Sequence, residues 1–95
     1  MRVFWTWPAR ADLENIVRYI ANENVDAAFE TEDDVRAATS RLADMPRMGR
    51  PGRATGTREL VVVHTPYVVI YRIQREQVEV LRVMHGAQDW PPQET

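Results

Sequence analysis

The chain has 95 residues, a formal net charge of −2 and no cysteine. This length corresponds to one domain over 1–95, and the lack of cysteine excludes disulfides, thiolate metal sites and a thiol nucleophile. The net charge excludes nucleic-acid binding through a basic field over the whole molecule. No run approaches the roughly 20 apolar residues that span a bilayer, and the apolar start is too short for a signal peptide, so we expect a cytoplasmic protein.

The first half of the chain predicts a short strand and two helices. β-Branched and aromatic residues favour a strand over 3–6, and Pro8 marks the start of a helix. Apolar side chains then recur at helical spacing, at Leu13, Ile16, Val17, Ile20 and Ala21. A second stripe predicts a helix over 26–44 that stops before Pro46. Because only a few residues separate the two helices, we expect an antiparallel helix hairpin.

The second half predicts a basic loop and a β-meander. Residues 48–56 are rich in glycine and proline, which favour a loop. Three apolar runs follow, over 57–64, 67–74 and 77–84, and we expect two-residue turns at Thr65-Pro66 and Arg75-Glu76. The predicted fold is therefore α+β, in the order β-α-α-β-β-β, with the N-terminal strand and helix hairpin packed on one face of a small antiparallel sheet.

These turns also fix a register for the meander. Glu59 is expected to face Arg72, and Arg72 to face Glu79, as a cross-strand charge ladder worth about 0.2–1 kcal/mol per pair. Period-two alternation places Arg82 on the opposite face, beside Val62 and Val69.

Both faces of this sheet are apolar, although an antiparallel sheet with one wet face should alternate between apolar and polar residues. The helix hairpin covers one face only, so we expect a partner chain or a second copy to cover the other. The residues assigned to this partner surface are Val68, Ile70, Leu81, Val83 and Trp90. The alternative is that a few exposed valines and isoleucines are ordinary surface residues.

The side chains able to hold a phosphate or move a proton are concentrated in the second half. Arg47, Arg50, Arg53 and Arg58 form a run without an acid, which is either a local basic patch or a solvated loop. The two histidines are far apart in sequence, and the chain has no cysteine, so the sequence argues against a zinc site. We therefore expect no metal and no cofactor.

The order of these elements resembles the RelE/ParE superfamily of toxins from bacterial type II toxin–antitoxin modules. The resemblance covers nearly the whole chain, and the ordered set of motifs carries it rather than any one of them. The matching motifs are Trp5 with Ala11-Asp12-Leu13, Ile16 and Tyr19-Ile20-Ala21; Pro46 with Gly49-Arg50; Arg53 with Gly56-Thr57-Arg58-Glu59-Leu60; Tyr67-Val68-Val69-Ile70-Tyr71; and Val80-Leu81-Arg82-Val83-Met84-His85.

The resemblance implies a growth-arresting toxin that is neutralised by direct binding of an antitoxin. RelE-like members cut mRNA on the ribosome, whereas ParE-like members poison DNA gyrase without known hydrolytic chemistry. For RNA cleavage, the catalytic candidates are His85, Arg58 and Glu59, and the candidates for holding phosphate are Arg50, Arg53, Arg72 and Arg82. The alternative reading of His85 is structural, because it stands at a strand end before Gly86.

The sequence departs from the RelE-like pattern at two places. The arginine that these enzymes place after the first tyrosine of the third strand is Val68 here, and their basic residues beyond the last strand are replaced by Ala87 and Gln88. The ending Arg82-Val83-Met84-His85 is closer to ParE-like chains. We therefore favour a ParE-like action on gyrase, with a ribosome-dependent mRNA endonuclease as the alternative and a non-toxic antitoxin-binding module as a second one.

Overall fold

A computed structural model of the chain describes residues 1–88, 90 and 91. Over these residues the order of strand, helix hairpin and β-meander is as predicted. A one-turn helix after the hairpin and a short strand inside the basic loop are additional. The elements are β1 (Arg2–Trp5), α1 (Trp7–Ala21), α2 (Val25–Ser40), the 3-10 helix η1 (Arg41–Ala43), β2 (Arg50–Pro51), β3 (Arg58–Val61), β4 (Tyr67–Gln74) and β5 (Gln77–His85).

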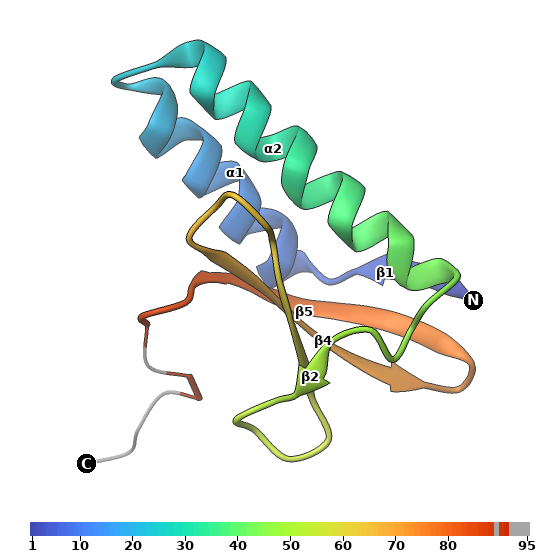
Figure 1. Cartoon of the computed structure of the whole chain (residues 1–95). Coiled ribbons are helices and arrows are strands. Elements are labelled where there is room, and N and C mark those ends of the chain that lie inside the picture. Colours follow the sequence, from blue (N-terminus) through green and yellow to red (C-terminus); the bar gives the residue numbers. More distant parts are fainter. Residues whose placement is uncertain (89, 92–95) are drawn as a thin grey trace.

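Side-chain caps explain where the two helices begin. The Thr6 hydroxyl accepts a hydrogen bond from the Ala9 N–H in the first turn of α1, where proline is also tolerated. The side-chain oxygen of Asn24 accepts one from the Ala27 N–H and so caps α2. The hairpin turn is therefore confined to 22–24, and both helices lie on one side of the sheet (Figure 1).

The sheet has the order β1-β5-β4-β3-β2, and it is mixed rather than purely antiparallel. β1 pairs with β5 in parallel, whereas the other neighbouring strands are antiparallel. The helix hairpin carries the chain from β1 to the far side of the sheet. The meander of β3, β4 and β5 then returns to β1, and its third strand runs in the same direction as β1.

The register between β3 and β4 differs from the prediction by two residues. Glu59 lies opposite Ile70 rather than Arg72, because β3 ends at Val61 and a longer turn replaces the predicted two-residue one. A slip of two residues leaves each side chain on its predicted face. The turn at Arg75 and Glu76 is as predicted: both residues have positive φ, and Arg72 pairs with Glu79 across it.

A β-bulge in β5 overturns the prediction for Arg82 and Val83. The pairing with β4 shifts between Ile70 and Tyr71, so that Tyr71 pairs with Val80 and Ile70 with Arg82. Leu81 is the extra residue in the bulged strand, and every residue after it changes face. Val83 therefore lies opposite Val69 and joins the core beneath the helices, where Arg82 had been expected.

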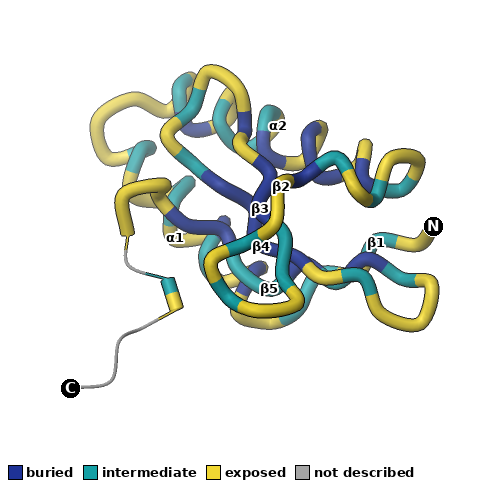
Figure 2. Tube along the Cα trace, turned by 60° about the horizontal axis from the view of Figure 1, so that its bottom comes forward, coloured by how far each residue is buried: buried dark blue, intermediate teal, exposed yellow. Residues whose placement is uncertain are grey.

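The core lies between the helix hairpin and the middle of the sheet (dark blue in Figure 2). It is formed by side chains that share one face of β3, β4 and β5 with the inner faces of the helices. Its buried members are Ala9, Leu13, Val35, Ala38, Leu42, Leu60, Val62, Val69, Tyr71, Val78, Val80 and Val83.

The second face of the sheet is also largely covered, by segments of the same chain. Val68 and Ile70 are buried there, although we expected a partner to cover this face. Gly86 packs near the Val68 side chain, and its N–H donates to the Pro66 carbonyl. Nothing in the sequence indicated that the basic loop and the segment after β5 pack against this face, and coverage of its remaining exposed part by a partner stays a prediction. Within the described residues, no helix has the length and apolar character needed to cross a membrane.

Candidate functional site

Glu59 is the buried centre of the basic loop. Its side chain is only 1% exposed, and its carboxylate accepts hydrogen bonds from the Arg53 N–H at 2.8 Å and from Arg53 Nε at 3.1 Å. Arg50 Nη2 donates to the other oxygen at 3.3 Å. Burial alone would raise the pKa of Glu59, but these donors outweigh it, and the pKa is lowered from its ordinary value of 4.5. The predicted ladder of Glu59 with Arg72 is therefore replaced by a pairing with the loop.

The lowered pKa of Glu59 gives a prediction for stability against pH. Because the folded-state pKa lies below the unfolded value, the contribution of the carboxylate is present above pH 4.5 and is lost as the pH falls through the folded-state pKa. We expect Glu59→Gln to flatten the loss of unfolding free energy in this acidic range, as measured by urea denaturation. Glu23→Gln, at an exposed carboxylate, is the matched control and should keep the slope of the parent.

The same loop is linked to the segment that follows β5. Arg53 Nη1 donates to the Gln88 carbonyl at 3.1 Å, while Arg53 Nε remains on Glu59. One guanidinium thus joins the loop, the second face of the sheet and the C-terminal segment. Arg50 and Arg53, both predicted to hold phosphate, are brought together by Glu59, which neutralises part of their charge.

Tyr71 holds the other end of the loop. Its buried hydroxyl donates to the Pro46 carbonyl at 2.7 Å and accepts from the Gly49 N–H at 2.8 Å. A Cβ at position 49 would lie 2.6 Å from this hydroxyl, so only glycine allows the close approach. Burial raises the pKa of Tyr71, which keeps the hydroxyl protonated and able to donate.

Arg82 is joined to α1 rather than free to bind phosphate. Its Nε and Nη2 donate to the two oxygens of Asp12, at 2.7 and 2.9 Å, and the Val83 N–H donates to Asp12 at 2.9 Å. The hydrogen bonds from Arg82 to Asp12 raise the pKa of Arg82 still further. β1 ends at Trp5, so Asp12 takes the place of the missing neighbouring strand at this part of β5.

His85 lies at the exposed end of β5, three residues beyond Arg82, which shares a cross-strand row with Ile70 and Glu59. Its ring packs edge-on against Tyr67, with centroids 6.0 Å apart, and its Nδ1 accepts a hydrogen bond from the Ala87 N–H at 3.1 Å. Burial raises the pKa of Tyr67, with a smaller contribution from Tyr19 nearby. The three catalytic candidates are thus not brought together: Arg58 is on the opposite face from Glu59, and His85 is three residues beyond the cross-strand row that contains Glu59.

The residues assigned to a partner surface differ in exposure. Val68, Ile70 and Val83 are buried, whereas Leu81 and Trp90 are partly exposed. The assignment therefore stays a prediction, and a partner that touched the three buried residues would first have to displace parts of this chain.

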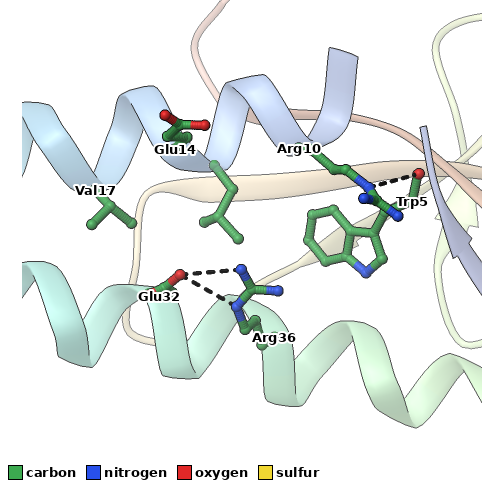
Figure 3. A pocket seen from close by; sticks show the side chains of 7 residues that line it. Trp5, Arg10, Glu14, Val17, Glu32 and Arg36 are labelled. Carbon is green, nitrogen blue, oxygen red and sulfur yellow. Dashed lines mark hydrogen bonds and ion pairs between the residues drawn. The ribbon is translucent and has the colours of Figure 1, made fainter. Parts of the chain in front are cut away.

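A groove between α1 and α2 was not found from the sequence. It has a volume of about 510 Å³ and is lined by both helices and by Trp5 at the end of β1 (Figure 3). The Arg36 guanidinium lies 5.8 Å from the Trp5 ring centroid, and Arg10 Nε donates to the Trp5 carbonyl. The same two helices also carry three exposed aromatic side chains, Trp7, Tyr19 and Phe29. The apolar stripes of the two helices predicted only their contact with the core and gave no signal for the groove.

Comparison with known proteins identifies the family that this chain resembles. Residues 3–90 match the family described as the ParE toxin of the type II toxin–antitoxin system parDE. The chain is 44% identical to Y4kP of Sinorhizobium fredii, over 95% of this chain and 93% of that protein. It is 41% identical to toxin RelE2 of Caulobacter vibrioides, over 90% of this chain and 96% of the relative.

Two solved structures share the fold. A chain of the chromosomal ParDE system from P. aeruginosa superposes with a TM-score of 0.79 at 25% identity, covering 90% of this chain and 95% of that one. A chain of the RelBE2 toxin–antitoxin complex from Mycobacterium tuberculosis gives a TM-score of 0.54 at 31% identity, covering 88% and 95%. The match over almost the whole chain, together with the strand order and helix hairpin, shows that this protein belongs to the ParE toxin family of type II toxin–antitoxin systems, within the RelE/ParE superfamily.

Proposed function

We propose that this toxin arrests growth by a ParE-like action on DNA gyrase, without hydrolytic chemistry, and that direct binding of a cognate antitoxin neutralises it. The observation that carries the choice of target is the engagement of the groups that RNA cleavage would need. A catalytic base must be free to take a proton, and cations must be free to hold the scissile phosphate.

Neither requirement is met on the second face of the sheet, among the residues that the structure describes. Glu59 is buried and paired with two arginines. Its pKa is lowered, which makes its carboxylate a weak base. Arg82 is held by Asp12, and the third-strand position that carries an arginine in RelE-like enzymes is the buried Val68. His85 is exposed, but its Nδ1 already accepts a hydrogen bond from Ala87.

Purified toxin can be tested in parallel for inhibition of gyrase and for ribosome-dependent cutting of mRNA. We expect inhibition of gyrase supercoiling and no codon-positioned cutting of mRNA on translating ribosomes. His85→Ala should leave the effect on supercoiling unchanged. Ribosome-dependent cuts that disappear in His85→Ala, with supercoiling untouched, would establish the endonuclease reading instead. A chain that neither arrests growth nor affects either target would be the non-toxic binding module.

The groove between the helices supports the antitoxin part of the proposal. An amphipathic helix docks its apolar face into a groove of this kind. Trp5, Leu13 and Val17 contribute apolar side chains here, and the other lining residues are charged: Arg10, Glu14, Glu32 and Arg36. Both solved relatives named above come from toxin–antitoxin systems.

Antitoxin binding should raise the stability of the toxin by mass action. With free antitoxin tenfold above its Kd, we expect a gain of about 1.4 kcal/mol in unfolding free energy, because the partner binds only the folded state. Val17→Glu, in the wall of the groove, should abolish the accompanying rise in Tm. Glu76→Lys, on the β4–β5 turn, should retain it. An equal rise for both variants would place the antitoxin elsewhere.

A further inference from the structure

The cations of the basic loop fall into two groups that face different surroundings. Arg50 and Arg53 are paired with Glu59. Arg47 and Arg58 instead border an open pocket of about 310 Å³, whose other lining residues are Pro51, Gly56, Thr57 and Ile73. No carboxylate lines this pocket, and neither arginine forms a salt bridge with any residue in the described part of the chain. The pocket therefore carries an excess of positive charge.

Arg58 is held in a fixed position at this pocket. Its Nη1 donates to the Gly49 carbonyl at 2.8 Å and to the Arg47 carbonyl at 3.4 Å. A guanidinium carries five N–H donors in a rigid fork, so about three remain after these two bonds. Gly49 is itself held by Tyr71, which means that a buried side chain of β4 indirectly sets the position of Arg58. Less side-chain entropy is lost on binding when a donor is already ordered.

The opposite rim of the pocket is open. Gly56 has a φ of +79°, and a Cβ built there would meet no atom within 4 Å. The hydroxyl of Thr57 donates to the Ala54 carbonyl and closes the loop behind the rim. At this part of the rim, Gly56 therefore places no side chain in the way of a group that approaches from solvent.

We propose that the pocket formed by Arg47 and Arg58 binds a phosphate group of a nucleic-acid backbone. The arginine fork matches phosphate oxygens, and two cations without a neighbouring acid suit an anionic ligand. A protein partner would need large apolar or aromatic anchors, whereas the apolar side chains in this lining are Pro51 and Ile73, and Ile73 is partly buried against the core. The inference rests on the proposed function, in which the nucleic acid is the DNA engaged by gyrase.

This assignment differs from the phosphate-binding residues expected from sequence. Arg72 is paired with Glu79 and Arg82 with Asp12, in addition to the two arginines on Glu59. The phosphate site consequently lies at the edge of the sheet beside β2, and not on its second face.

The test measures the binding of a fluorescently labelled DNA duplex to the purified full chain by anisotropy, at several salt concentrations. We expect Arg47→Gln and Arg58→Gln each to weaken binding about fivefold or more at low salt. Each should also reduce the slope of log K against log salt by about one, since each removes one phosphate contact. Arg2→Gln removes the same charge at the opposite edge of the sheet, from an arginine without a salt bridge in the described structure, and should bind like the parent.

Two controls distinguish a loss of DNA binding from a loss of folding. Because Arg58 holds two loop carbonyls, its variant is accompanied by a Tm measurement, whereas no hydrogen bond of the Arg47 side chain is recorded in the described structure. Duplex binding that is unchanged in Arg47→Gln, or a parent chain that binds polyglutamate but no DNA, would overturn the phosphate site. If the same parent preparation still inhibited supercoiling, the proposed action on gyrase would stand without the phosphate site.

Discussion

Replacing Asp12 by alanine should lower the free energy of unfolding by about 2–3 kcal/mol. The carboxylate is largely buried and accepts three hydrogen bonds, two from Arg82 and one from the Val83 N–H. Its removal leaves a backbone donor of β5 and a partly buried guanidinium without their acceptor. The cost stays below that of breaking a fully buried pair because the Arg82 side chain is about one-third exposed and water reaches it.

Urea denaturation of the purified chain measures this effect, and the chain offers a matched control. Glu14 is two residues further along α1 and forms an exposed pair with Arg18, with both side chains more than 60% exposed. Glu14→Ala should therefore cost no more than about 0.5 kcal/mol. If the two variants lost stability equally, Asp12 would be an ordinary surface residue and the hydrogen bond to β5 would contribute little.

Replacing Tyr71 by phenylalanine should cost a similar amount, about 2–3 kcal/mol, although it removes a single oxygen atom. The ring is fully buried and would keep its packing. The loss comes from the Gly49 N–H and the Pro46 carbonyl, which would be left without a partner in a place that water reaches poorly. Each buried polar group left unsatisfied costs about 1–3 kcal/mol.

Tyr67→Phe is the control for this change, because it removes the same atom from the same strand. No hydrogen bond of the Tyr67 hydroxyl is recorded among the described residues, so we expect a change within about 0.5 kcal/mol. Hydrogen exchange would locate the difference: the Gly49 amide should exchange faster in Tyr71→Phe and keep its protection in Tyr67→Phe. Unchanged exchange in both variants would mean that the loop does not depend on the tyrosine.

Much of the fold could be predicted because it depends on local patterns. The apolar stripe of α1 and the Arg75-Glu76 turn each act over a few residues, and the structure confirms them. The parallel pairing of β1 could not be predicted in this way, since it depends on where the helix hairpin returns the chain. The bulge at Leu81 was missed because a one-residue insertion leaves an apolar run looking continuous.

The candidate site was less predictable because charged residues choose among several partners. Asp12 lies near the start of α1, where its spacing gives no sign of a partner, yet its bonds are to Arg82 and Val83 of β5. Glu59 had an apparent partner in Arg72 by strand spacing, but the loop folds back and supplies two arginines and a backbone N–H. Sequence spacing constrains pairing within a strand or helix, and it carries no information about a loop that crosses the sheet.

The pairing of the first strand with the last one has a consequence for synthesis of the toxin. Thr6 donates to the Val80 carbonyl, 74 residues further along the chain, and β1 pairs with the residues leading to it. The sheet therefore remains incomplete while most of the chain is being translated, since the ribosome must release β5 before β1 has a neighbour. A nascent toxin thus passes through translation with an unfinished sheet and acquires its complete folded form only near the end of its own synthesis.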